Sequence, residues 1–311
     1  MEKRIIPVVR QFNIKRIQSP IPRIKNKEVI NDVIKRSQVI KNKIGTQIIQ
    51  RPVKVVQNNV RIAKYVKQSV RIPNPIIKDY NYNKLMSIKN SGKGNILVMI
   101  ACGPSINEID LSPLKNINNL KTMIINKPVD SVWPSNYWAF CDHSQYVRNQ
   151  RAFEEYTGLL LNSIGVKARR SNQILISARQ GKGFNKDITQ GYFIGRSSVY
   201  ANMQTALFMD FDKIFIFGID MCAVNGKTHH YGDGSNPDVE TKIRIQRFNY
   251  EADHYMNASN IMSPEDRNRF YFCSSYNKFP FIEKFNKLDH KIAVNYILEL
   301  PEIKSSCKSI M

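Results

Sequence analysis

Apolar residues gather in the second part of the chain, where they form short continuous runs that end in turn residues. Five such runs are Asn95–Ala101, Leu120–Asn126, Tyr137–Asp142, Ile174–Ser177 and Lys213–Asp220. A run of this kind is typical of a β-strand buried on both faces. Between the runs, residues 143–157 and 197–210 have the composition of helices, the second with Ser197 or Ser198 as its N-cap.

Strands that alternate with helices predict an α/β fold with a single Rossmann-like parallel sheet flanked by helices. We assign this domain to residues 95–311. Ligands of such sheets bind beyond the carboxyl ends of the strands. The small and polar residues that follow the predicted strands are Gly103, Pro104, Ser105, Asn126, Asp142, His143, Gly218 and Asp220.

Residues 1–80 follow a different pattern, in which Ile/Val clusters alternate with Lys and Arg and six prolines interrupt the chain. They hold 19 Lys and Arg against 4 Asp and Glu, which is most of the net charge of +22. This composition predicts a long, extended basic arm that binds a polyanion or an acidic protein assembly. A solvated tail is the alternative. Residues 81–94 are expected to be a linker, with a flexible hinge at 90–94.

The remaining composition indicates where the protein works. The five cysteines are scattered without a Cys-x-x-Cys pair, which is typical of reduced thiols in a cytoplasmic protein. No run of 18 apolar residues occurs, so no membrane span is expected. We therefore expect a cytoplasmic location, either the host cytoplasm or a virion if a phage encodes the chain. The oligomeric state is left open.

Ile100-Ala-Cys-Gly-Pro-Ser-Ile-Asn-Glu-Ile-Asp110 resembles the opening motif of the bacterial sialyltransferases that use CMP-activated sialic acid. It is equally similar to related bacterial and phage proteins that include motility accessory factors. The resemblance extends to Asn126 after the second strand, to the helix start at Ser197–Tyr200 and to the strand end Gly218–Asp220, with His229 and His230 on the next loop. It covers about residues 95–290 and none of the arm.

The resemblance implies a metal-independent glycosyltransferase with no cofactor besides its nucleotide-sugar donor, which is CMP-linked in the sialyltransferases. It implies that the nucleotide and its phosphate are bound by free backbone N–H groups and side chains of Gly103, Pro104, Ser105, Asn126, Ser197 and Ser198. His230, or else His229, would be the general base on the acceptor hydroxyl, with a pKa near the working pH. Substrate contacts are expected from Asp142, His143, Asp220 and Tyr231.

Two departures from the family pattern leave the donor sugar open. Ser198 stands where the family has Gly, and Tyr231 is the single local tyrosine where the sialyltransferases use two. The residues also have other readings: Asp142 as a helix cap, Asp220 as a turn cap, and solvated loop histidines. A divalent cation bound by His229, His230, Asp233 and Asp238 is a further alternative.

The arm suggests two other classes of function. The chain is alternatively a structural component of a phage virion or other large assembly that retains the enzyme fold and uses the arm as a tether. It is otherwise a nucleic-acid-modifying transferase whose arm holds DNA or RNA.

Overall fold

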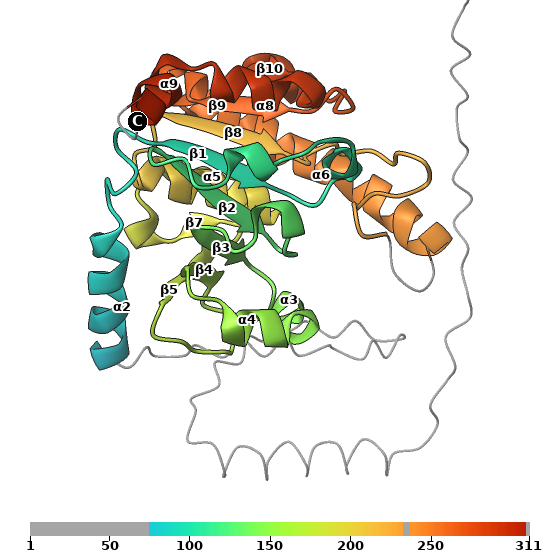
Figure 1. Cartoon of the computed structure of the whole chain (residues 1–311). Helices are drawn as coiled ribbons and strands as arrows, with labels where there is room; N and C mark the ends of the chain where they lie inside the picture. The colour runs from blue at the N-terminus through green and yellow to red at the C-terminus, as the bar shows by residue number, and fades with distance from the viewer. Residues whose placement is uncertain (1–74, 233–236, 309–311) are drawn as a thin grey trace, which may run out of the picture. The chain divides into compact units, whose positions relative to one another are not determined.

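The computed structural model describes residues 75–232 and 237–308. Within these ranges eight strands form one sheet in the order β10-β9-β8-β1-β2-β3-β4-β5, and every neighbouring pair is parallel (Figure 1). Its strands are β1 (Ile96–Ile100), β2 (Leu120–Ile125), β3 (Tyr137–Phe140), β4 (Leu159–Ser163), β5 (Gln173–Ile176), β8 (Lys213–Phe217), β9 (Phe270–Cys273) and β10 (Asn286–Leu288). The predicted α/β fold with a parallel sheet flanked by helices is confirmed, although residues 178–179 and 192–193 form a second, two-stranded parallel sheet. The predicted arm lies, up to residue 74, outside the described residues.

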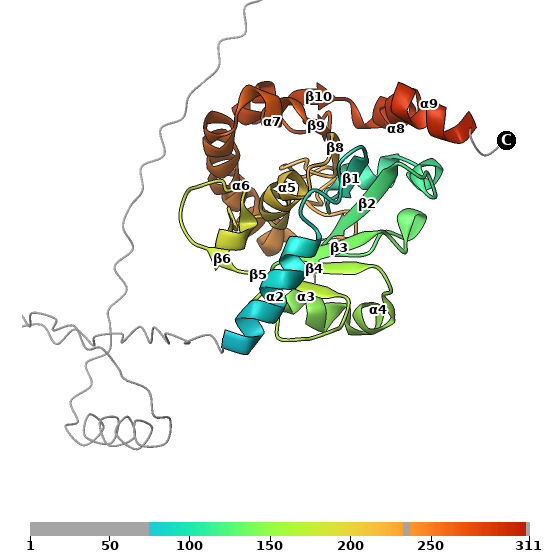
Figure 2. The same cartoon turned by 90° about the vertical axis from the view of Figure 1, so that its left-hand side faces the viewer.

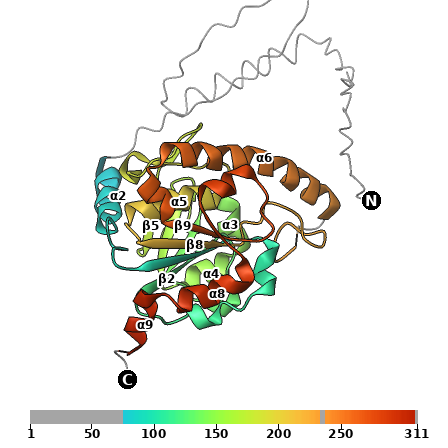
Figure 3. The same cartoon turned by 90° about the horizontal axis from the view of Figure 1, so that it is seen from above.

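Helices cover both faces of the sheet (Figure 3). One face carries α5 (Ser198–Phe208) and α6 (Pro237–Ile261), and the other carries α8 (His290–Leu298) together with short 3-10 turns. The remaining elements are α2 (Pro75–Ser87), α3 (His143–Arg148), α4 (Gln150–Glu155), α7 (Pro264–Asn268), α9 (Pro301–Lys308), the pair β6 (Ala178–Arg179) and β7 (Tyr192–Phe193), and the 3-10 turns η1 (Pro104–Glu108), η2 (Ser112–Leu114), η3 (Asp130–Val132), η4 (Ile188–Gln190) and η5 (Pro280–Lys284). None of the described helices is long and apolar enough to cross a bilayer.

The central strand β1 is apolar throughout because both of its faces are covered. Along β1, Leu97 and Met99 pack in the core beneath α5, while Ile96, Val98 and Ile100 pack in the core on the opposite face. All five side chains are buried. Alternate side chains of a strand point to opposite faces, so a continuous apolar run is what a doubly covered strand requires.

The helix expected over residues 143–157 is two short helices. α3 and α4 meet at Asn149, whose backbone is not helical, with φ −125° and ψ 30°. Its side-chain amide donates to the Gln145 carbonyl at 2.8 Å and so pairs with the end of α3. A side chain that competes for the backbone in this way favours a break in the helix.

The expected linker over residues 81–94 belongs to the folded domain. α2 packs against β5, the strand at one edge of the sheet (Figure 2). The Asn81 side chain pairs with the strand edge, donating to the Leu175 carbonyl at 2.5 Å and accepting from the Leu175 N–H at 3.0 Å. Leu85 and Ile88 are buried in the core beneath α5.

The predicted hinge at 90–94 is also tied down. The N–H groups of Asn90 and Gly92 donate to the carbonyls of Phe208 and Met209 at 3.1 and 2.6 Å. A Cβ atom on Gly92 would overlap the Phe211 ring. The prediction of a flexible linker was wrong. The local sequence could not show these contacts, because the partners lie more than 100 residues away in the sequence. A fragment meant to fold must therefore include α2.

Candidate functional site

Strand order places the candidate site between β1 and β8. From β1 the chain proceeds outward through β2 to β5, and from β8 it proceeds outward in the opposite direction through β9 to β10. Adjacent strands whose connections leave in opposite directions open a crevice at their carboxyl ends, where ligands of such sheets bind. The turns at this point are Gly103–Ser105 after β1 and Gly218–Asp220 after β8.

The two turns are locked to each other by hydrogen bonds. The Gly103 N–H donates to the Gly218 carbonyl at 2.8 Å, and the Ser105 N–H donates to Asp220 Oδ2 at 2.8 Å. The next N–H, of Ile106, donates back to the Gly103 carbonyl at 3.3 Å. The N–H groups expected to be free for phosphate are therefore used within the protein, and Pro104 has none.

Gly103 is required by this packing. A Cβ atom at position 103 would overlap the Asp220 carboxylate and the Gly218 carbonyl. Gly218 itself has φ +70°, a left-handed conformation that favours glycine. A substitution at Gly103 would thus break the contact between the turns, so its effect on ligand binding could not be separated from an effect on folding.

Two roles were expected for Asp220, contact with the substrate or a cap on the turn, and its contacts are those of the second. Its side chain is 1 % exposed, and its second oxygen accepts a hydrogen bond from Ser274 Oγ at 2.6 Å. The carboxylate thereby joins the ends of β1, β8 and β9. Because both oxygens are engaged below the surface, Asp220 positions the turn and does not itself present an acceptor to a ligand.

The loop that carries the two histidines is held against the turn after β1. The His230 N–H donates to the Cys102 carbonyl at 2.8 Å, and the His230 carbonyl accepts from the Asn107 side chain at 2.8 Å. His229 Nδ1 lies 3.1 Å from the Thr228 hydroxyl. The structure thus brings His230 to the carboxyl end of β1, where the sequence predicts a ligand site.

The His230 ring is neutral in this setting. Burial and the nearby Lys127 ammonium lower its pKa from 6.5 to about 4. The expectation of a pKa near neutrality is therefore wrong. A buried imidazole surrounded by cations loses its proton more easily than one in water.

Three predicted side chains present buried polar atoms that make no hydrogen bond within the described part of the chain. They are Ser105 Oγ, Asn126 Oδ1 and His230 Nε2. Asn126 follows β2, the neighbour of β1, with a left-handed φ of 66°. Its backbone is fixed there, because its N–H donates to Ala139 at 2.9 Å and its carbonyl accepts from Trp138 Nε1 at 2.8 Å. A buried polar atom without a partner costs about 1–3 kcal/mol, so three of them at adjoining strand ends indicate a place for a polar ligand.

The predicted residues at the start of α5 are partly engaged. Ser197 occupies the N-cap position, but its hydroxyl lies 3.1 Å from the Tyr255 hydroxyl instead of capping the helix. The Ser198 hydroxyl bonds the Cys141 thiol at the end of β3. These contacts tie the first turn of α5 to α6 and to the sheet.

Asp142 and His143 have the contacts of a helix cap, as one of the two readings of the sequence predicts. Asp142 Oδ1 accepts from the Ser144 N–H at 3.1 Å at the start of α3. His143 Nδ1 accepts from the Lys167 N–H at 3.3 Å. The pair thus joins α3 to the loop after β4.

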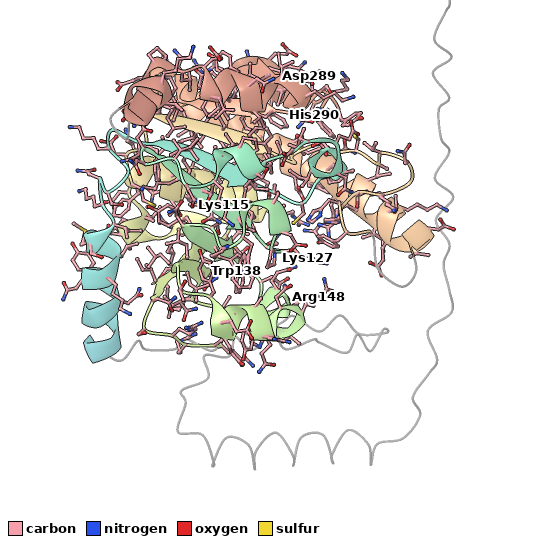
Figure 4. The ribbon with its side chains drawn as sticks, in the orientation of Figure 1. Lys115, Lys127, Trp138, Arg148, Asp289 and His290 are labelled. Carbon is pink, nitrogen blue, oxygen red and sulfur yellow. The ribbon has the colours of Figure 1, made fainter. Side chains whose placement is uncertain are left out.

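Basic side chains surround the crevice. Lys127 lies with its ammonium 4.5 Å from the centre of the Tyr231 ring, and the Tyr231 hydroxyl bonds the Cys102 thiol. Arg148 and Arg244 both act electrostatically on Tyr231. Figure 4 shows Lys127 and Arg148 near one another, on the side of the sheet toward which the strands point in Figure 1.

α6 contributes charged residues that were not among the predicted site residues. Arg244, Arg247 and Glu251 are spaced three and four residues apart, so they share one face of this helix. Arg247 Nη2 is 3.8 Å from Glu251 Oε1, and Arg244 acts electrostatically on both Glu251 and Tyr231. That spacing is the signal from which this part of the site could have been found.

Glu251 is a buried carboxyl group in this basic surrounding. Burial outweighs Arg247, Arg244 and Arg196 and raises its pKa from 4.5 to about 7. Near neutral pH a large fraction of Glu251 is therefore uncharged, which leaves the positive field of the three arginines available to an anion. A carboxyl group with a pKa near 7 is also suited to proton transfer.

This shift predicts a dependence of stability on pH. Because folded Glu251 retains its proton up to about pH 7 and the unfolded chain loses it near 4.5, stability from this group falls as the pH rises between these values. We expect the free energy of unfolding of the wild-type chain to fall by about 1–3 kcal/mol relative to Glu251→Gln between pH 5 and 8. Denaturant titrations of both proteins at these two pH values measure the difference. A parallel pH dependence of the two proteins would contradict the raised pKa.

The described residues also enclose hollows away from these turns. One of about 560 Å³ lies between α6 and η5, and one of about 340 Å³ lies between Trp133 and the α3–α4 corner. None of the predicted site residues lines either hollow. Among the described residues no three His, Cys, Asp or Glu side chains form a group that could hold a metal ion, and Asp233 of the alternative cation site lies outside them.

Comparisons with known protein families, with curated proteins and with solved structures find no match.

Proposed function

We propose that the chain is a metal-independent glycosyltransferase that moves a sugar from a nucleotide donor to an acceptor hydroxyl. The observation that carries the proposal is the set of three unpartnered polar atoms, on Ser105, Asn126 and His230, at the carboxyl ends of adjoining parallel strands. The resemblance of residues 100–110 to the sialyltransferase motif supports the same reading.

Side chains take the place of the backbone in this binding mode. Ser105 Oγ and Asn126 Oδ1 are the groups left to meet the nucleotide, since the N–H groups of the Gly103–Ser105 turn are engaged. Lys127, Arg148 and Arg244 supply the positive charge for the phosphates. Cations in a partly dry crevice attract a phosphate more strongly than cations in water do.

The transfer itself needs one base. The acceptor oxygen bonds to the anomeric carbon, the bond from that carbon to the donor phosphate breaks, and the nucleotide leaves with the bonding electrons. The acceptor proton passes to His230 Nε2, which is neutral and has no partner among the described residues. Bound phosphate would offset the nearby Lys127 charge and so raise the pKa of His230, making it a stronger base when the donor is present.

Nucleotide binding to the full chain tests the proposal. We expect one of CMP, UDP or GDP to raise the melting temperature, because a ligand at 100 times its Kd stabilises the folded state by about 2.7 kcal/mol. Asn126→Asp should weaken that effect at least about tenfold, because it adds negative charge beside the phosphates. Asn116→Asp is the matched control, since Asn116 has the same left-handed backbone, with φ 65°, but is exposed at a distant turn. The proposal fails if none of the three nucleotides stabilises the protein or if both variants bind like the wild type.

A further inference from the structure

A second group of reactive side chains lies at the same edge of the sheet and takes no part in the proposed transfer. Ser275 follows β9, His290 begins α8 after β10, and Glu108 ends η1 after β1. Ser275 Oγ is 3.0 Å from His290 Nδ1, and His290 Nε2 is 3.3 Å from Glu108 Oε2. A hydroxyl, an imidazole and a carboxylate are therefore connected in series, with the imidazole in the middle.

The hydrogen bonds indicate where the imidazole proton lies. The Ser275 N–H is directed at His290 Nδ1 over 3.4 Å, so this nitrogen is an acceptor. Nε2 must then carry the proton, which it donates to the Glu108 carboxylate. Asp289 Oδ1, 3.6 Å from Nδ1, accepts the Lys291 N–H at 2.8 Å. In this tautomer Nδ1 is able to accept the Ser275 hydroxyl proton.

The surroundings keep Glu108 ionised and the imidazole in place. The Tyr276 hydroxyl donates to Glu108 Oε1 at 2.6 Å, and Lys291 Nζ lies 3.4 Å from Oε2. The Tyr276 hydrogen bond in particular lowers the pKa of Glu108. His290, labelled in Figure 4, is completely buried. Its ring lies 5.3 Å from the Tyr276 ring.

Access differs along the line of three groups. Ser275 is half-buried and Glu108 is exposed, while His290, which contacts both, is completely buried. A hydroxyl backed by a base that a carboxylate orients is the arrangement of an activated nucleophile. The neighbouring Ser274 holds Asp220 and so fixes the loop from which Ser275 projects.

We propose that Ser275 is a nucleophile toward ester-type electrophiles, with His290 as its general base and Glu108 as the residue that positions His290. In the first step Ser275 Oγ bonds to the acyl carbon, its proton passes to His290 Nδ1, and the ester alkoxide leaves with that proton as an alcohol. Water then attacks the acyl-serine, His290 takes the water proton and passes it to Ser275 Oγ as the acyl–oxygen bond breaks, and the acid is released. Atoms and charge balance without a further reactant.

A fluorophosphonate probe tests this chemistry without a nucleotide or sugar. Attack by Ser275 forms a P–O bond and expels fluoride, and intact-mass and peptide analysis locate the adduct. We expect the full wild-type chain to carry one adduct at Ser275, and Ser275→Ala to carry none. Glu108→Gln should slow labelling by about 10²-fold, because loss of an oriented base costs on the order of 10²–10⁴-fold in rate.

The controls separate reactivity from structural damage. Ser144→Ala removes another half-buried serine, at the start of α3, and should label like the wild type. Melting temperatures of all variants report folding. Stabilisation by nucleotides, measured on the same samples, tests the proposed function independently of the labelling, so that each proposal can fail without the other. Absence of a Ser275 adduct, under conditions that fully label a serine hydrolase, would overturn the proposal. Equal labelling rates for Glu108→Gln and the wild type would overturn the role of Glu108.

Discussion

The affinity of the full chain for generic DNA or RNA is expected to fall by about 10³–10⁵-fold between about 50 and 200 mM salt. Residues 1–74 hold 18 of the 47 Lys and Arg residues of the chain. Engagement of roughly six to ten of them with phosphates is enough for a loss of this size, because each contact releases condensed counterions. The segment has only two aromatic residues, Phe12 and Tyr65, so little base stacking and little sequence preference are expected.

The control for this prediction is a fragment that begins at residue 75, because one that began at the expected hinge, at residue 90, would be too short to fold. The shorter fragment would lose α2, with Leu85 and Ile88 from the core, and would confuse loss of binding with loss of folding. We expect residues 75–311 to bind weakly and with a much shallower salt dependence. Equal binding by both proteins would show that the basic segment has no such role. Salt-insensitive retention of the full chain in a larger particle would favour the alternative of a structural assembly component.

The parts of the fold that could be predicted are those whose signal is local. β1 is a continuous apolar run, and β2 and β8 are mostly apolar, because the sheet is covered on both faces, and such a run is visible without knowledge of the partners. β10 has three residues, Asn286–Leu288, of which none is buried, so no such run marks it. α2 was missed because its apolar residues follow no helical period and because Asn81 finds its partner 94 residues away.

The candidate site shows the same division. Turn composition picks out Ser105 and Asn126 after β1 and β2, because parallel strands bring their carboxyl ends to one edge, whereas His230, on the loop after β8, is singled out by the family resemblance alone. It could not show that the Ser105 N–H is already bound by Asp220, 115 residues later. Nor could it show that Ser275, His290 and Glu108 meet. The first two follow β9 and β10, which β8 separates from β1, and Glu108 follows β1.

Replacement of His230 by alanine is expected to lower the rate of sugar transfer by about 10²–10⁴-fold, the usual cost of removing a general base. His143→Ala is the matched control, because His143 is another half-buried histidine at this edge whose ring accepts the Lys167 N–H. His229→Ala should have a smaller effect than His230→Ala if His230 is the base.

The dependence of kcat/KM on pH carries more information than the size of the loss. This ratio reports the pKa of the base in the free enzyme, and burial lowers that of His230 to about 4. A base must be unprotonated to act, so we expect the decrease in kcat/KM that is caused by protonation of His230 to occur only near pH 4. Any decrease near pH 6.5 should persist in His230→Ala. A transition near pH 7 that disappears in Glu251→Gln would instead identify Glu251, whose pKa is about 7, as a participant. A loss below about fivefold in both His230→Ala and His229→Ala would remove both histidines from the mechanism, because a general base contributes far more than this.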